Sequence, residues 1–345
     1  MTDIHDVAAA AGLSTATVSR ALRGLAGVSE ATRQRVLDAA VALNYVPSRA
    51  AAGLASGKTR TVAVVVPHVT RWYFATVVQG AEEVFRREGY DLLLFNLGGD
   101  PEARHRVLQT HQLTKRADAL LILGLQPTEA EKIWLRDHAP PVALVGASVP
   151  EWPSVRIDDA AAAATAVLHL LELGHRRIAF VGGDLDEALD FATPRARRYG
   201  YRSTLATAGI VPDPALEQVG LFTIAGGVEA GKRLLALSDP PTAVFCASDE
   251  MAIGVLRSAQ LAGLRVPEDL SVVGIDDHEM AEFLDLTTVA QPVLEQGRRA
   301  ARQVLDLLSA ARSGTPADHN DHLELPTELV VRGSTGMRPR PAGGR

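Results

Sequence analysis

The stretch D-V-A-A-A-A-G-L-S-T-A-T-V-S-R-A-L, residues 6–22, decides how the N-terminal part of this chain folds. Two short helical patterns flank Gly12, which permits a tight turn, and Ser14 is a strong N-cap for the second pattern. Small alanine side chains let two such helices cross closely. The layout is that of a helix-turn-helix, and the side chains expected to pack it are Val7, Ala8, Ala11, Leu13, Val18, Ala21 and Leu22.

Capping residues on either side complete a three-helix unit. Asp3 and Asp6 have the N-cap and N3 spacing that begins a first helix. Ser29 caps a third helix that runs to about Leu43, and Pro47 closes the unit. We therefore expect an all-α head over residues 1–46, followed by a hinge and linker over residues 47–60.

The charge of the chain is divided unevenly between this head and the rest. The net charge is −6, yet residues 1–60 contain seven basic and four acidic side chains, which gives the head +3 and leaves −9 for the remainder. A basic head on an acidic body favours binding of a polyanion through the head alone.

The second helix of the head is predicted to be the recognition helix, which contacts DNA bases. If it lies in a major groove, Thr15, Ala16 and Arg20 point outward to base edges, and Arg20 is able to fork onto guanine O6 and N7. The hydroxyl side chains placed for phosphate contacts are Ser14, Thr17, Ser19, Ser29 and Thr32. The alternative is an ordinary three-helix bundle in which these Ser and Thr residues only cap helices.

From Thr61 the pattern changes to apolar strands alternating with amphipathic helices, and Gly89, Gly174 and Gly263 stand where helix C-termini are expected. Repeated strand–helix units predict doubly wound parallel sheets, and the pattern is long enough for two of them. The expected strands are TVAVVVP (61–67), YDLLLFN (90–96), ADALLIL (117–123), PVALVG (141–146), RIAFVGG (177–183), TAVFCAS (242–248) and SVVGIDD (271–277).

Residues 6–22, together with VSEATRQRVLDAAVALNYVPSRAAAGL at 28–54, resemble the head and hinge of the Lac/Gal repressor family. The resemblance continues to about residue 333. It implies a transcription regulator that binds a near-palindromic DNA operator as a homodimer, most often as a repressor, with activation left open. It also implies a hinge helix over residues 48–55 that wedges Leu54 into the minor groove, with Tyr45 and Ser48 as further DNA contacts.

For residues 61–333 the resemblance implies a sensor like a periplasmic binding protein, with two α/β subdomains around a cleft. The expected subdomains are 61–158 with 290–322, and 159–289 with 323–333. Residues 334–345 are rich in Pro, Gly and Arg, and we expect them to be a disordered tail.

The ligand of this sensor is expected beyond the carboxyl ends of the strands. Arg197 matches the Arg that binds effector in the family, and Asp276 matches the Asp that accepts from ligand hydroxyls. Their pairing indicates a polyhydroxylated small molecule, with a sugar as the expected class. For Asp249, helix capping is an equal alternative to ligand contact. The remaining candidate ligand residues are Arg71, Trp72, Tyr73, Phe222, Ser248 and Gln291.

Several other classes of protein are disfavoured by what the sequence lacks. The first residues carry no basic n-region and no apolar run reaches the ~20 residues of a membrane span, so we expect a cytoplasmic protein without membrane contact. We find no dinucleotide fingerprint, phosphate loop, GxSxG elbow or metal-ligand spacing, and we expect no cofactor, metal or enzymatic activity. A transporter's solute-binding protein shares the sensor fold, but residues 1–60 argue against it, and a sugar-processing enzyme lacks its catalytic residues.

Overall fold

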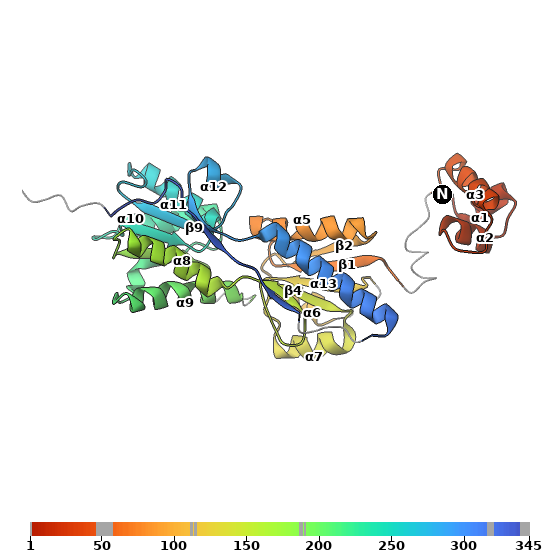
Figure 1. The fold of residues 1–345 in the computed structure, drawn as a ribbon, viewed down its shortest axis with the longest axis horizontal. Coiled ribbons are helices and arrows are strands. Elements are labelled where there is room, and N and C mark those ends of the chain that lie inside the picture. The colour runs from red at the N-terminus through yellow and green to blue at the C-terminus, as the bar shows by residue number, and fades with distance from the viewer. Residues whose placement is uncertain are drawn as a thin grey trace, which may run out of the picture. The chain divides into compact units, whose positions relative to one another are not determined.

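The computed structural model of the protein describes residues 2–45, 58–110, 113, 116–185, 189, 191–315 and 321–338. The chain separates into two compact units, residues 1–60 and 61–345 (Figure 1). We describe each unit by itself. The predicted hinge helix over residues 48–55, with Ser48 and Leu54, lies outside the described residues.

The head contains α1 (Ile4–Ala11), α2 (Thr15–Leu22) and α3 (Glu30–Ala42), as predicted. Asp3 accepts hydrogen bonds from the backbone at the start of α1, while Asp6 accepts from the backbone N–H of Asp3, so the capping box is confirmed. Gly12 ends α1 with φ 63°, a left-handed conformation that favours glycine. The predicted helix contacts are also confirmed, because Val7, Ala8, Ala11, Val18 and Ala21 are buried in one core with residues of α3.

The larger unit is built on two six-stranded sheets among the described residues (Figure 1). The first has the order β11-β5-β4-β3-β1-β2, with every pairing parallel. Its strands are β1 (Thr61–Val66), β2 (Asp91–Asn96), β3 (Ala119–Leu123), β4 (Val142–Val145), β5 (Ser154–Arg156) and β11 (His322–Glu324). The helices that accompany it are α5 (Trp72–Arg87), α6 (Pro101–Leu108), α7 (Glu129–His138) and α13 (Val293–Ser313).

The second sheet has the order β12-β10-β9-β8-β6-β7 and is parallel except for β12 against β10. Its strands are β6 (Ile178–Gly182), β7 (Glu217–Val219), β8 (Ala243–Cys246), β9 (Ser271–Asp276), β10 (Thr287–Ala290) and β12 (Glu328–Val330). The accompanying helices are α8 (Asp159–Glu172), α9 (Ala192–Thr207), the 3-10 turn η1 (Pro214–Leu216), α10 (Ile224–Leu235), α11 (Asp249–Leu261) and α12 (Met280–Phe283).

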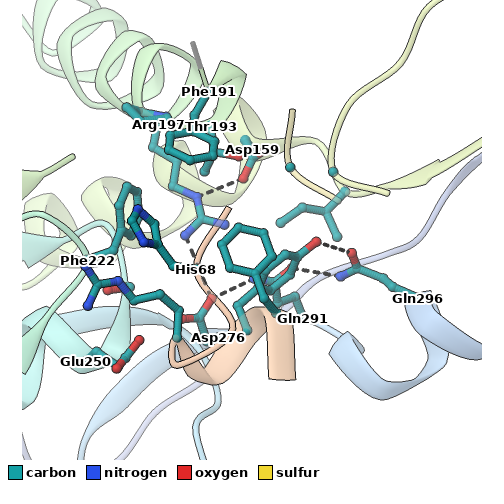
Figure 2. Close-up of a pocket in the computed structure, with 18 of the residues that line it drawn as sticks. His68, Asp159, Phe191, Thr193, Arg197, Phe222, Glu250, Asp276, Gln291 and Gln296 are labelled. Carbon is teal, nitrogen blue, oxygen red and sulfur yellow. Dashed lines mark hydrogen bonds and ion pairs between the residues drawn. The ribbon is translucent and has the colours of Figure 1, made fainter. Parts of the chain in front are cut away.

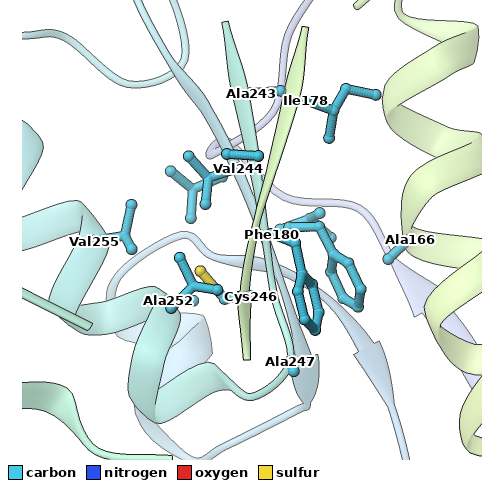
Figure 3. Packing of buried hydrophobic residues seen from close by; sticks show 14 of the residues in the cluster. Ala166, Ile178, Phe180, Ala243, Val244, Cys246, Ala247, Ala252 and Val255 are labelled. Atoms are coloured by element: carbon cyan, nitrogen blue, oxygen red, sulfur yellow. The ribbon is translucent and has the colours of Figure 1, made fainter. Parts of the chain in front are cut away.

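All seven predicted strands are therefore present, in sheets of the predicted doubly wound kind. In the described residues the chain passes between the sheets three times, from β5 to α8, from β10 to α13 and from β11 to β12. Each sheet is covered by apolar side chains. In the second sheet, Phe180 lies 5.1 Å from Tyr201 and 5.5 Å from Phe245 between ring centres. Figure 3 shows Cys246 beside Ala252 of α11, and the thiol of Cys246 is free and buried.

The described chain after residue 333 is packed against the second sheet. Ser334 is only 3% exposed. Its hydroxyl donates to the carbonyl of Val272 at 2.6 Å and accepts from the backbone N–H of Thr287 at 2.8 Å. The predicted start of a disordered tail at residue 334 is therefore too early, because these bonds satisfy buried backbone groups of β9 and β10. None of the described helices has both the length and the apolar character to cross a bilayer.

Two glycines set the contact between α5 and α13. A Cβ on Gly80 would lie 2.1 Å from the carbonyl oxygen of Leu294, and a Cβ on Gly297 would lie 2.1 Å from that of Val77. The two helix backbones therefore approach too closely for any side chain at either position.

We expect Gly297→Ala to destabilise the larger unit. The added methyl group must displace a backbone carbonyl, which costs ~1–3 kcal/mol as overpacking and outweighs the ~1 kcal/mol gain in helix propensity. Urea unfolding followed by circular dichroism measures the change. The control is Ser309→Ala on the exposed side of α13, and equal stabilities of the two variants would contradict the tight contact.

Candidate functional site

The outer face of α2 presents the predicted base readers. Ala16 and Arg20 are exposed and Thr15 is partly exposed. Arg20 has no hydrogen-bond or ion-pair partner in the described part of the head, so its guanidinium is available. The side chain of Tyr45 packs partly against the core of the head.

Two of the predicted phosphate-binding hydroxyls, those of Ser14 and Ser29, cap helices. Ser14 Oγ accepts from the backbone N–H of Thr17, and Ser29 Oγ accepts from that of Thr32. The hydroxyls of each pair also lie 2.9 and 2.8 Å apart, respectively. These side chains and that of Ser19 remain exposed or partly exposed, so capping leaves them accessible to DNA. Their contacts with phosphates stay predictions.

The larger unit contains a cavity of about 270 Å³ lined by residues associated with both sheets (Figure 2). Several of the residues that line the cavity come just after the end of a strand in the sequence. Gly124 follows β3, Gly146 follows β4, and Ser248 comes after β8. The cavity therefore lies at the carboxyl ends of the parallel strands, as the sequence predicted. The predicted ligand residues that line it are Arg71, Tyr73, Arg197, Phe222, Ser248, Asp276 and Gln291.

Arg197, from α9, is the buried cation of this cavity. Its Nε donates to Asp159 Oδ1 at 2.8 Å, and its Nη1 donates to the carbonyl of Ala247. Nη1 also lies 3.8 Å from Asp276 Oδ1, so one guanidinium is flanked by two carboxylates. A buried charge needs such partners, because an unpaired one costs several kcal/mol.

Asp276 ends β9 with an unusual backbone. Its φ is 134°, and Leu221 and Phe222, which also line the cavity, have φ of 58° and 50°. Backbone strain of this kind persists where the surrounding structure imposes it and is concentrated at functional sites. Burial raises the pKa of the Asp276 carboxyl to about 6, although Arg197 acts in the opposite direction.

Two predicted ligand residues do not line the cavity. Asp249 is fully buried at the start of α11, where it accepts from the backbone N–H of His278 at 2.8 Å and from Thr288 Oγ1 at 2.7 Å. Neither alternative for Asp249 describes these contacts, because the cap of α11 is Ser248, whose hydroxyl accepts from the backbone N–H of Met251. Trp72 stands with its ring centre 4.8 Å from that of His278 instead of facing the cavity.

Sequence reasoning missed more than half of the residues that line the cavity. Phe74 is adjacent to the predicted Tyr73, and Gly124 and Gly146 follow predicted strands, so a signal existed for these three. The side chains that reach the cavity from helices and loops gave no such signal: Ile157, Asp159, Phe191, Thr193, Pro194, Leu221, Glu250 and Gln296. His68, which lies between β1 and α5, also lines the cavity. Among the described residues, no cluster of His, Cys, Asp or Glu is arranged to hold a metal ion.

We expect Asp249→Asn to flatten the pH dependence of stability. Burial, with the charge of Asp276 adding to it, raises the pKa of Asp249 to about 8, above the ordinary carboxyl value of about 4. The folded chain therefore holds this proton more tightly than the unfolded chain, and the contribution of Asp249 to stability falls as pH rises from about 4 to about 8.

The measurement is the free energy of urea unfolding at about pH 5 and about pH 8. The asparagine variant loses less stability than the native chain between these pH values, since its side chain has no proton to release. Asp306→Asn on the exposed face of α13 is the control. If the unfolding free energy of Asp249→Asn changed with pH as much as that of the native chain, the Asp249 carboxylate would already be charged at the lower pH.

Comparison with known proteins places both units. Residues 3–48 match the family described as bacterial regulatory proteins, lacI family, and residues 167–335 match the periplasmic binding protein-like domain. The chain is 37% identical over 340 residues to the HTH-type transcriptional repressor CytR of Escherichia coli K12, with 97% of each chain covered. It is 34% identical over 336 residues to catabolite control protein A of Priestia megaterium, covering 96% of this chain and 98% of that protein.

Solved structures agree with these sequence matches. The Lac repressor dimer bound to operator and the anti-inducer ONPF superposes with a TM-score of 0.83 at 27% identity, covering 97% of this chain and 99% of that one. The complex of the transcriptional regulator CelR with cellobiose gives 0.69 at 32% identity, covering 97% and 100%. CytR is named as a repressor and not as an enzyme. With its head matched by the family description and 37% identity to a repressor over nearly its whole length, the chain belongs to the lacI family of bacterial regulatory proteins.

Proposed function

We propose that this chain represses transcription by binding a near-palindromic operator as a homodimer, under the control of a sugar bound in the cavity of the larger unit. The observation that carries the choice of ligand is Arg197 held between Asp159 and Asp276 at the wall of that cavity. The protein would act in the cytoplasm, where its operator lies.

The chemistry of the cavity suits a ring with several hydroxyls. Arg197 supplies N–H donors and Asp276 supplies carboxylate acceptors close to one another, which is the arrangement that pairs with neighbouring hydroxyls. Phe74, Phe191 and Phe222 offer apolar faces for the C–H side of a sugar ring. Relatives of known structure support this class of ligand, since one is a complex with cellobiose and another, from Enterococcus faecium, holds ribose.

The dimer is supported by an exposed apolar surface on α12. Phe283 is 80% exposed, and its neighbours Met280 and Leu284 are also exposed. The Lac repressor, which shares the fold, is a dimer on its operator. Two heads in one dimer read two half-sites about one DNA turn apart, with Thr15, Ala16 and Arg20 at base edges. Ser48 and Leu54 remain the proposed contacts at the centre of the operator.

The proposed control is a shift between two arrangements of the sensor. The cavity lies between two sheets joined by three chain crossings, so a ligand that touches both sides favours one arrangement over the other. Coupling energies of this kind are typically ~1–3 kcal/mol. Such a shift is enough to change operator affinity by about one or two orders of magnitude.

We expect Arg20→Ala to weaken operator binding by ~1–3 kcal/mol and to relax specificity at one base pair of each half-site, since a bidentate guanine contact is lost. Electrophoretic mobility shifts on the operator and on unrelated DNA measure the two effects. The control is Arg35→Ala on the exposed face of α3, which we expect to weaken binding to both DNAs alike. Equal losses on both DNAs for Arg20→Ala would remove its base-reading role.

We expect Arg197→Lys to lose the sugar response while keeping operator binding. Lysine preserves the charge between the two carboxylates, so the variant folds, but it loses the planar fork that pairs with a diol. The full-length protein is first tested by thermal shift with D-ribose, cellobiose and other sugars.

A sugar that raises the Tm of the native chain is expected to have little effect on Arg197→Lys and the full effect on Arg198→Lys. Arg198 is the matched control because it pairs with Glu217 and does not line the cavity. The sugar proposal fails if no sugar shifts the native chain.

A further inference from the structure

A line of hydrogen bonds runs along one wall of the cavity, from α5 to the end of β9 (Figure 2). Tyr73 Oη donates to Gln296 Oε1 at 2.9 Å. Gln296 Nε2 donates to Gln291 Oε1 at 2.8 Å, and Gln291 Nε2 donates to Asp276 Oδ1 at 2.6 Å. Tyr73 and Gln296 stand on helices of the first sheet, whereas Asp276 ends a strand of the second.

The direction of every bond in this line is fixed by its carboxylate end. An ionised carboxylate only accepts, so Gln291 must turn its NH₂ group toward Asp276 and its oxygen toward Gln296. Gln296 must then present its own NH₂ group to Gln291, which leaves its oxygen for Tyr73. The Tyr73 hydroxyl has a single hydrogen, and burial raises its pKa above the ordinary value, so it stays protonated and donates.

This order decides what the cavity offers to a ligand. With its hydrogen committed to Gln296, Tyr73 has only the lone pairs of Oη left, and these accept hydrogen bonds. Space for the hydroxyl is provided by Gly146, where a Cβ would lie 3.2 Å from Oη. Gln291, which also lines the cavity, retains a second N–H as a donor.

Gln296 is the one residue of this line that was not predicted to contact the ligand. It is fully buried on α13 and it contacts both neighbours through different atoms of one amide. If its side chain were apolar, Tyr73 would be free to turn its hydrogen into the cavity, and the amide of Gln291 would lose the partner of its oxygen. A buried polar group without a partner costs ~1–3 kcal/mol, so both neighbours would rearrange.

We propose that Gln296 is a positioning residue of the effector site, which makes Tyr73 an acceptor toward the cavity and so selects ligands that present a hydroxyl or N–H hydrogen to Tyr73. The proposal deepens the sugar-binding function and rests on it for the identity of the ligand. The arrangement of Tyr73 and Gln296 exists without ligand, so it can be tested separately.

The first experiment is nuclear magnetic resonance of full-length protein carrying ¹³C at the Cζ of tyrosine, in equal parts of H₂O and D₂O. A hydroxyl whose hydrogen is held exchanges slowly and gives two Cζ signals, whereas a free hydroxyl gives one. The Tyr73 signals are assigned with Tyr73→Phe. Tyr201 is an internal reference, because its buried hydroxyl donates to the carbonyl of Ile178 at 2.8 Å.

We expect two Tyr73 signals in the native chain and in Gln296→Glu, which keeps an acceptor for Tyr73, and one signal in Gln296→Met. Gln303→Met is the matched control, because Gln303 is a buried glutamine of α13 that donates to Asp321 at 2.8–2.9 Å and does not line the cavity. Two signals in Gln296→Met, or a single signal in the native chain, would overturn the positioning role.

The second experiment is calorimetric titration of the same proteins with D-ribose and with cellobiose. For whichever sugar binds the native chain, Gln296→Met and Gln296→Glu are expected to bind about fivefold to tenfold more weakly, and Gln303→Met equally well. Equal affinities in all variants would overturn the selection by Gln296. If the native chain binds neither sugar, the proposed class of effector fails, while the tyrosine signals still decide the positioning role.

Discussion

Parallel strands end together, and this constraint decides where the chemistry of the larger unit is found. Every strand of the first sheet, and all but β12 in the second, run in one direction within their sheet, so their carboxyl ends meet at one edge. Backbone groups at that edge have no further strand to pair with, and the chain turns there into loops and helix starts. Ser248 and Asp276 come together at the carboxyl ends of the second sheet for this reason, and Gly146, at the same end of the first sheet, lines the same cavity.

The charges of the cavity follow from its burial. A guanidinium or carboxylate removed from water is stable only with partners of opposite charge and with its hydrogen bonds made. Arg197 therefore lies against both Asp159 and Asp276, and Asp276 in turn accepts from Gln291. Asp249 shows the other solution, since its carboxyl group is satisfied by backbone and hydroxyl donors and takes no part in the cavity wall. Asp276 thus faces the cavity, whereas Asp249 of α11 is hydrogen-bonded to Thr288 of β10.

The sequence was sufficient for features that depend on local pattern. Continuous apolar runs predicted the long strands, serines and aspartates predicted the helix starts of the head, and family resemblance located Arg197 and Asp276. Strands of three residues such as β5 and β7 were not predicted, since so short a segment has no readable period. Asp159 and Gln296 reach the cavity only because α8 and α13 pass beside it, and that depends on how helices pack in three dimensions. Trp72 was misplaced because adjacent residues at a helix start point in different directions.

The glycine contact between α5 and α13 has a mechanical consequence. Gly80 and Gly297 bring the two helices so close that main chain touches main chain, and neither helix can slide without a clash. Tyr73 and Gln296 stand on this fused pair, so the distance between them does not respond to movements of the second sheet. Gln291 directly follows β10, which pairs with β9, so Gln291 and Asp276 stay together in the second sheet. Any separation of the two sheets is therefore taken up between Gln296 and Gln291. The pair formed by α5 and α13 therefore moves as one body, and a separation of the sheets must break the contacts that this pair makes with the other side, among them Gln296 with Gln291 and Trp72 with His278.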